Sequence, residues 1–196
     1  MTLEVLPTAQ RVNFAQLFGN SRPVELEIGC GKGTFILSRA AARSDLNFLG
    51  IEWARSYCEY AADRVRRAGL ANVRMACVDA TVFVHNHLAD ESIWRLHVYF
   101  PDPWPKRRHF RRRSMTLAFV KELRRILKPG GQLLVVTDHL NYFHQIRRVV
   151  LGTSGLASVS FPKVSSVAGE LTGTNFERKY IAEGRPVFSL AVLKHQ

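Results

Sequence analysis

Cysteine is scarce in this chain of 196 residues, and the few cysteines are scattered. The chain has three, Cys30, Cys58 and Cys77, and no two of them form a C-x-x-C pair. Disulfide-stabilised small domains and zinc sites use several closely spaced cysteines. We therefore expect reduced thiols in the core rather than disulfides, and no metal site.

Long hydrophobic runs are also missing. No stretch approaches the roughly 18 uninterrupted apolar residues of a membrane span, and the first residues, MTLEVLPTAQR, carry Glu4 where a secretory signal would have basic residues and then an apolar core. The sequence therefore predicts a cytoplasmic protein that does not bind a membrane. With 46% apolar residues, a chain of this length can form one domain that buries roughly 70% of its unfolded surface. We place this domain at 24–196, after a short N-terminal segment at 1–23.

Acidic residues are few compared with basic ones. There are 16 Asp and Glu against 28 Lys and Arg, which gives a net charge of +12. A local cluster of cations attracts polyanions and releases their counterions on binding. One short run, KRRHFRRR, predicts a nucleic-acid contact on this basis, and the alternative is a solvated basic surface. Its basic residues are Lys106, Arg107, Arg108, Arg111, Arg112 and Arg113.

Strand and helix patterns alternate along the chain. This alternation predicts right-handed βαβ crossovers and an α/β fold with a doubly wound, mainly parallel sheet. Within it we expect Thr34 and Ser114 to cap helices and the Pro-Gly-Gly at 129–131 to end one. The expected strands are 24–29, 47–53, 73–80, 93–100, 132–138 and 185–195, with another near 156–161 in a loop-rich stretch at 152–175. The expected helices are 34–42, 54–69, 115–128 and 141–151, with a weaker one at 81–90.

A glycine loop, GCGKG at 29–33, follows the first expected strand, and acidic residues stand at or beyond the ends of several strands. Because ligands bind at the carboxyl ends of parallel strands, we expect these acids to face one crevice. The loop lacks the G-x-G-x-x-G spacing of dinucleotide sites and the G-x-x-x-x-G-K-[ST] spacing of phosphate loops. Acids beside the loop suit a ligand with a cationic end, such as S-adenosylmethionine, and the alternative is a tight turn with solvated acids. The acids are Glu27, Glu52, Asp79, Asp102 and Asp138.

The stretch PDPWP, just before the basic run, reads as a stiff turn. Three prolines fix φ and withhold backbone donors, so they orient the single acid between them, Asp102. Trp104 either stacks on a base or packs against the next helix. For Phe110 we favour an anchoring role in the loop over base stacking.

Other reactive side chains have no evident partners. Cys30 in the glycine loop has no evident basic partner that would activate its thiol, so we interpret it as a small residue rather than a nucleophile. The seven histidines are dispersed and form no acid–histidine–nucleophile pattern.

Several segments together resemble a known family. ELEIGCGKG, GIEW, CVDA, YFPDPWPKRRHFRRR, LKPGGQLLVVTDH and TNFERKY are similar to segments of the bacterial tRNA (guanine-N7-)-methyltransferases. The similarity runs from about Val24 to the C-terminus, and PDPW with its basic run and the late T-x-F-E are its most specific parts. It implies a Rossmann-like, seven-stranded fold of the class I methyltransferase type. It also implies that the chain uses S-adenosylmethionine to methylate a guanine in the tRNA variable loop, position 46.

The resemblance also implies roles for individual residues. Asp102 would be the catalytic residue, and tRNA the partner, with no partner protein required. The cofactor-binding residues would be Glu27, Gly29, Gly31, Glu52, Asp79 and Asp102. The substrate-binding residues would be Lys106, Asp138, Thr174, Asn175, Phe176 and Glu177. The RNA-binding residues would be Arg108, His109, Phe110, Arg111, Arg112 and Arg113.

The chemistry implied by this function needs little proton transfer. Guanine N7 has an in-plane lone pair and no proton to lose, so positioning of the base dominates. Carboxylates hold guanine by accepting from its N1–H and amino group, and Asp102, Asp138 and Glu177, the last in an expected loop, are candidates. The alternatives are a small-molecule or other RNA methyltransferase, a non-catalytic RNA-binding protein on the same scaffold, and, least favoured, a nicotinamide-dependent oxidoreductase.

Overall fold

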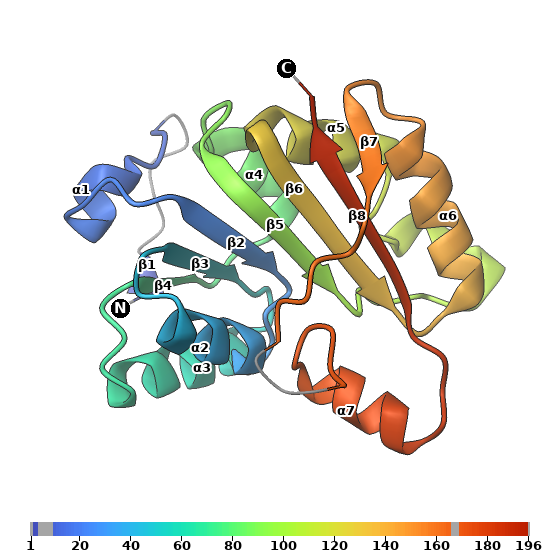
Figure 1. Cartoon of the computed structure of the whole chain (residues 1–196), viewed down its shortest axis with the longest axis horizontal. Coiled ribbons are helices and arrows are strands. Elements are labelled where there is room, and N and C mark those ends of the chain that lie inside the picture. Colours follow the sequence, from blue (N-terminus) through green and yellow to red (C-terminus); the bar gives the residue numbers. More distant parts are fainter. Residues whose placement is uncertain (1, 4–9, 166–168, 196) are drawn as a thin grey trace.

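The computed structural model describes residues 2–3, 10–165 and 169–195 (Figure 1). The strands are β1 (Thr2–Leu3), β2 (Val24–Ile28), β3 (Asn47–Ile51), β4 (Val73–Ala76), β5 (Ile93–Tyr99), β6 (Leu127–Thr137), β7 (Leu156–Val159) and β8 (Phe188–Lys194). The helices are α1 (Phe14–Phe18), α2 (Thr34–Ala42), α3 (Arg55–Arg67), α4 (Ala80–His87), α5 (Leu117–Ile126), α6 (Leu140–Leu151), α7 (Asn175–Ala182) and the 3-10 helix η1 (Arg107–Arg112).

The strands form one sheet in the order β1-β4-β3-β2-β5-β6-β8-β7. All pairings are parallel except those of β8, which runs antiparallel to β6 and β7. The expected α/β fold with a doubly wound, mainly parallel sheet is confirmed. In addition to the seven expected strands, the sheet has a two-residue edge strand, β1. Successive strands extend in opposite directions from the β2–β5 pair, so the carboxyl ends of these two strands form a topological switch point.

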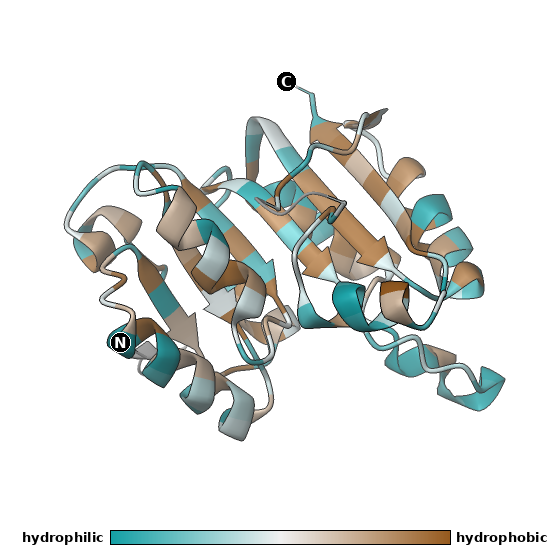
Figure 2. Cartoon of the chain, turned by 60° about the horizontal axis from the view of Figure 1, so that its bottom comes forward, coloured by the Kyte–Doolittle hydropathy of each residue, from teal (hydrophilic) through white to brown (hydrophobic). Residues whose placement is uncertain are grey.

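Both faces of the sheet are covered by helices. Figure 2 shows hydrophobic residues concentrated along the central strands. On one face Ile36 of α2 and Ala61 of α3 pack in a cluster with Phe48 and Met75 of β3 and β4. On the other face α4, α5 and α6 supply the larger cluster, whose strand residues include Leu26, Leu96 and Leu133. Strands buried on both faces explain the nearly continuous apolar runs of the sequence.

The described part of the N-terminal segment packs against the rest of the domain. Phe18 of α1 belongs to the larger core cluster, and the backbone N–H of Val12 donates to the carbonyl of His87 at 2.8 Å. Most of the residues at 1–11, on which the expectation of no secretory signal rests, lie outside the described part of the chain. No helix among the described residues is long and apolar enough to cross a membrane.

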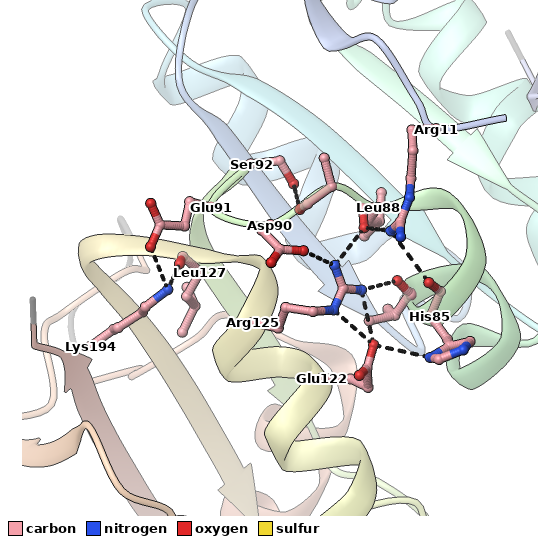
Figure 3. Close-up of polar contacts among 12 residues, drawn as sticks. Arg11, His85, Leu88, Asp90, Glu91, Ser92, Glu122, Arg125, Leu127 and Lys194 are labelled. Atoms are coloured by element: carbon pink, nitrogen blue, oxygen red, sulfur yellow. Dashed lines mark hydrogen bonds and ion pairs between the residues drawn. The ribbon is translucent and has the colours of Figure 1, made fainter. Parts of the chain in front are cut away.

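The amino-terminal edge of β5 is fastened by one arginine (Figure 3). Arg125 of α5 donates to the carbonyls of Val84 and Leu88, both at 2.8 Å, and to Asp90 at 2.7 Å. Nearby, Lys194 donates to the carbonyl of Leu127 at 2.7 Å. These contacts tie α4, α5 and β8 together at the edge of the sheet away from the glycine loop.

Two of the three cysteines are joined, so the expectation of reduced thiols is wrong for them. Cys58 of α3 and Cys77, the residue after β4, form a disulfide, whereas Cys30 is free and buried. The sequence separation of 19 gave no sign of this pair. The contact arises because the buried face of α3 packs on the end of β4, which is a feature of the tertiary structure.

Some boundaries also differ from expectation. Gly33, not Thr34, is the N-cap of α2, and Thr116, not Ser114, caps α5 by accepting from the backbone N–H of Phe119. The residues at 127–131 extend β6 instead of ending a helix, because Leu127 pairs with Ile93 across the sheet. Gly131 is required there, since a Cβ would come within 2.8 Å of the Trp94 carbonyl.

Candidate active site

The glycine loop joins β2 to α2 at the switch point. Gly29, Gly31 and Gly33 all have positive φ, between 53° and 74°, a region that side chains with a Cβ rarely adopt. A Cβ on Gly29 or Gly31 would meet nothing within 4 Å, so these two positions leave open space above the loop. At Gly33 a Cβ would come within 2.8 Å of Leu37 and 3.0 Å of Ala61, so this glycine permits the close packing of α2 on α3.

A cavity of about 270 Å³ lies over this loop. The loop supplies one side, the end of β5 another, and the beginning of α7 a third. Figure 1 shows α7 beside the edge of the sheet where β2, β5 and β6 end. The lining residues are Glu27, Gly29, Cys30, Gly31, Lys32, Thr34, Phe35, Tyr57, Tyr99, Phe100, Thr174, Asn175 and Phe176.

Glu27 is the buried acid of this cavity. The residue is 4% exposed, and its Oε2 atom has no hydrogen-bond partner among the described residues. Burial raises the pKa of Glu27 to about 8; the neighbouring charge of Glu52 adds to the shift and the backbone amide of Ile36 opposes it. A buried carboxyl that no neighbouring cation balances is costly to ionise, so it fits a site whose ligand brings a positive charge.

Glu52 and Asp79 follow β3 and β4 at the same edge. Glu52 accepts from the backbone N–H of Gly31 and of Ala54, both at 2.8 Å. One oxygen of Asp79 caps α4 by accepting from the N–H groups of Thr81 and Val82. A carboxylate offers about four acceptor positions, so both acids keep positions for a ligand while their orientation is fixed by backbone amides.

The PDPW turn is strained on both sides of its acid. Phe100 and Trp104 have φ of 50° and 41°, a conformation that costs a residue other than glycine on the order of 1 kcal/mol or more. Asp102 between them is exposed and makes no hydrogen bond or ion pair to any described residue. Since Phe100 lines the cavity, the turn holds a free carboxylate two residues beyond the cavity wall.

Arg113 holds the turn in place and is not part of an exposed cluster. It is 2% exposed, and it donates to the carbonyl of Pro103 at 2.7 Å and to Gln145 of α6 at 2.6 Å. Its guanidinium also lies 3.8 Å from the ring centre of Phe110. The expectation that Arg113 contacts RNA is therefore wrong in this structure, because its donors are used to join the turn to α6.

The middle of the basic run forms η1, a 3-10 helix that no pattern in the sequence predicted. Arg107, Arg108, Arg111 and Arg112 are exposed, and none is paired with a carboxylate in the described part of the chain. Arg112 lies over the Trp104 ring at 4.9 Å, and His109 meets the same ring edge-on. Phe110 is half-buried against Arg113, which agrees with the anchoring role favoured for it.

Helix α7 replaces the loop expected around T-x-F-E. Thr174 accepts from the backbone N–H of Glu177 at 3.1 Å, and the Asn175 amide donates to Thr34 Oγ1 at 3.0 Å. Thr174, Asn175 and the exposed Phe176, which the resemblance assigns to the substrate, line the cavity. The Thr-x-x-Glu spacing is a helix-capping pattern, and it is the signal that could have predicted this helix.

Glu177 has a structural position instead of a free one. It is 1% exposed and accepts from the backbone N–H groups of Leu171, Thr172 and Gly173 at 2.6–2.9 Å. Its oxygens are therefore occupied by the loop that leads into α7. The proposed contact between Glu177 and guanine does not fit this arrangement.

Asp138, the remaining acid, forms an ion pair with Arg185 after α7. Arg185 also lies over the ring of Tyr180 at 4.0 Å. Asp138 therefore ties the end of β6 to the α7 region. Lys106 stands exposed at the N-cap of η1 and has no described ionic partner. Among the acids considered for guanine, Asp102 alone is unengaged by the described residues.

Sequence reasoning missed a polar chain behind the cavity. His97 on β5 contacts Glu25 at 3.0 Å and the hydroxyl of Tyr99 at 2.7 Å, and the ring of Phe35 packs edge-on against Tyr99. Each is a single polar or aromatic residue in an apolar strand or helix, and such residues are common in an ordinary protein core.

Cys30 fits its prediction, because burial, with the charges of Glu27 and Glu52, raises the pKa of its thiol well above the usual value. No cluster of three metal-ligating side chains occurs within the described ranges.

Comparison with solved structures places the fold. A SAM-dependent methyltransferase from Aquifex aeolicus superposes with a TM-score of 0.60 over 92% of this chain and 87% of its own, at 16% identity. The antibiotic-resistance methyltransferase Kmr gives 0.58 over 93% and 91%, at 18% identity. The Rossmann-like class I methyltransferase fold is thereby confirmed.

Comparison of sequences is more specific. A family model described as putative methyltransferase matches residues 21–190. The tRNA (guanine-N(7)-)-methyltransferase of Alkalilimnicola ehrlichii is 34% identical over 99% of this chain and 82% of its own length. The enzyme of the same name from Geobacillus thermodenitrificans is 36% identical over 96% and 87%. The chain therefore belongs to the family of the bacterial tRNA (guanine-N7-)-methyltransferases.

Proposed function

We propose that this protein transfers the methyl group of S-adenosylmethionine to N7 of the guanine at position 46 in the tRNA variable loop. The observation that carries the proposal is the order of three charged groups along one edge of the sheet. A buried carboxyl with one unpartnered oxygen, that of Glu27, lies in the cavity, the free Asp102 stands just beyond the cavity wall, and the unpaired cations of η1 follow it. Similarity to enzymes named tRNA (guanine-N(7)-)-methyltransferase supports both the reaction and the substrate.

The cavity suits the cofactor because its charges are complementary. S-adenosylmethionine supplies a methyl group on a sulfonium and also carries an ammonium. Glu27 would accept from the ammonium, which gives its orphaned oxygen a partner. Glu52, oriented by two backbone amides, would accept from the ribose hydroxyls. The free oxygen of Asp79 would accept from the adenine amino group.

Asp102 would hold the guanine. Its carboxylate can accept from N1–H and from the exocyclic amino group, which leaves N7 on the other side of the ring free to face the methyl group. No proton has to leave N7, so Asp102 acts by orienting the base. Correct orientation of two reactants can contribute roughly 7–11 kcal/mol to lowering a barrier. The strained, Arg113-held turn supports this role because it restricts where the carboxylate can point.

The exposed cations of η1 and Lys106 would bind the tRNA backbone near this turn. Phosphate contacts of this kind position a nucleic acid without reading its sequence. A base held by tertiary pairing has to be exposed before it reacts, at a cost of a few kcal/mol, and Trp104 beside the turn is placed to stack on it. We also propose the cytoplasm as the site of action, since the tRNA substrate is there.

Substitution of Asp102 tests this assignment. Asp102→Ala removes both acceptors, and Asp102→Asn turns an N–H group toward the guanine donors. We expect both variants to lose about 100-fold or more of kcat, since a small misplacement of a reacting group has an effect of this order. The Kd for tRNA should stay within about threefold of the wild-type value, because phosphate contacts supply most of the binding free energy.

Asp45→Ala is the matched control, because Asp45 is an exposed acid paired with Arg43 away from the cavity. It should leave both kcat and Kd unchanged. Turnover of Asp102→Ala at the wild-type rate would remove Asp102 from the active site.

A further inference from the structure

Helix α3 carries an exposed aromatic surface that the proposed cofactor and guanine contacts do not use. Tyr57 and Tyr60 are 49% and 50% exposed, and Trp53, in the turn that leads into the helix, is 71% exposed. Three large aromatic side chains within eight positions are more than a soluble surface needs. We call this group, Trp53, Tyr57 and Tyr60, the aromatic patch.

The helix separates this patch from its own acids. At 100° per residue, Tyr57, Tyr60 and Arg64 share one side of α3. The buried residues Cys58, Ala61 and Val65 occupy a second side. The acids Glu59 and Asp63 lie on a third side and are engaged by arginines of the same helix.

Cations lie among the aromatic rings of the patch. Lys32 of the glycine loop places its Nζ atom 5.6 Å from the ring centre of Tyr57 and 5.9 Å from that of Tyr60. The Arg64 guanidinium lies 6.0 Å from the Tyr60 ring and donates to the Lys32 carbonyl at 2.6 Å. Neither cation is paired with a carboxylate among the described residues. Aromatic rings interleaved with unpaired cations have the composition of surfaces that bind single-stranded nucleic acid.

The patch borders the cavity. Lys32 and Tyr57 line the cavity as well as contributing to this surface. In Figure 1, α3 lies on one side of α7 and α6 lies on the other side. Arg113 joins the turn before η1 to α6. An RNA whose target base reaches the cavity over η1 therefore has a second surface available across the cavity.

We propose that the aromatic patch, with Lys32 and Arg64, is a second RNA-binding surface that stacks on unpaired bases of the substrate next to the target guanine. This inference rests on the proposed function. The net charge of +12 and the aromatic rings interleaved with unpaired cations favour RNA, which offers both phosphates and bases that stack, over an acid-bearing protein surface, which offers the negative charge alone. The two surfaces then hold the RNA from both sides of the cavity, so that η1 binds phosphates and α3 binds bases.

Alanine substitutions test the stacking. Trp53→Ala and Tyr60→Ala should each raise the KM for tRNA by about five-fold or more, since stacking of a base on an aromatic side chain contributes on this scale. Tyr60→Phe retains the ring and should keep the wild-type KM. Trp94→Ala removes another exposed aromatic residue, at the beginning of β5, and should have no effect. The KM for S-adenosylmethionine should not change in any of these variants.

Tryptophan fluorescence gives a readout that a change of stability would not mimic. A base stacked on Trp53 quenches its emission. Addition of tRNA should therefore quench the tryptophan emission of the wild-type protein and of Trp94→Phe, whereas the emission of Trp53→Phe should be quenched much less. Full quenching in Trp53→Phe would contradict the proposal.

The other outcomes separate the alternatives. If the wild-type protein methylates tRNA but the patch variants keep the wild-type KM for tRNA, the inference fails and the proposed function stands. If the KM for S-adenosylmethionine rises instead, the patch belongs to the cofactor site. If gel filtration shows a dimer that Tyr60→Ala dissociates, with an unchanged KM for tRNA, the patch binds a second copy of the chain. A wild-type protein that does not methylate tRNA contradicts the proposed function itself.

Discussion

Glu25 and Glu27 lie two residues apart on β2 and face the same side of the sheet, but their carboxyl groups differ in charge state. Burial alone would raise the pKa of Glu25, but hydrogen bonds and charge from His97 and Arg39 outweigh it and hold that pKa well below the usual range. Glu27 has no such cation, and burial raises its pKa to about 8. The pair shows that the partners, not the residue type, decide which carboxylate is available to a ligand.

The pH dependence of cofactor binding follows from Glu27. Near neutral pH the carboxyl group is mostly protonated in the free protein, and a cationic ligand favours the ionised form, so binding releases a proton. The affinity for S-adenosylmethionine should therefore rise with pH between about 6 and 7.5, by up to about ten-fold per pH unit. Glu27→Gln should weaken binding and flatten this dependence, which calorimetry at several pH values would measure.

The free energy of unfolding gives an independent check on Glu27. A carboxyl whose pKa is raised from 4.5 to about 8 on folding binds more protons in the folded state, so its contribution makes stability fall as pH rises between those values. Glu27→Gln should remove this fall, while Glu59→Gln, which changes an exposed acid paired with Arg55, should not. An unchanged pH dependence in Glu27→Gln would contradict the assigned ionisation.

The elements around the site have distinct tasks. The turn after β5 carries Asp102, the acid proposed to orient the guanine, η1 presents unpaired cations, and α7 closes one side of the cavity through the Asn175 contact to Thr34. Alternating apolar runs made the strands and helices predictable. Helix α7 was missed because its one local signal, the Thr-x-x-Glu cap, follows a loop-rich stretch, and η1 was missed because it depends on the way Arg113 folds the basic run against α6.

The salt dependence of tRNA binding tests the role assigned to η1. Arg107→Ala with Arg111→Ala removes two exposed cations, and each lost phosphate contact should reduce the slope of log K against log salt by about one. The matched control is Arg66→Ala with Arg67→Ala, because these exposed arginines are paired with Asp63 on α3. If both double variants have the same slope as the wild-type protein, η1 is only a solvated surface.

In the whole molecule, the site forms where the strand order changes direction between β2 and β5. The sequence was sufficient to predict the sheet and the acids at the ends of its strands, but of those five acids Glu27 alone lines the cavity. The sequence was not sufficient to predict the buried, structural positions of Arg113 and Glu177 or the Cys58–Cys77 disulfide. Each of these depends on a partner that only the folded chain brings near, such as the Pro103 carbonyl or the amides at 171–173. A charged residue in a basic run or in a family-like motif can therefore either bind a ligand or stabilise the fold, and only its burial and its partners distinguish the two roles.

The most direct test of the account is to locate the transferred methyl group. The protein would be incubated with labelled S-adenosylmethionine and an unmodified tRNA that has guanine at position 46, and the product would be cleaved chemically at N7-methylguanine. We predict one cleavage site, at position 46, and no label in the same tRNA with adenine at that position. Label at another position, label in the adenine variant, or no label in either tRNA would contradict the account.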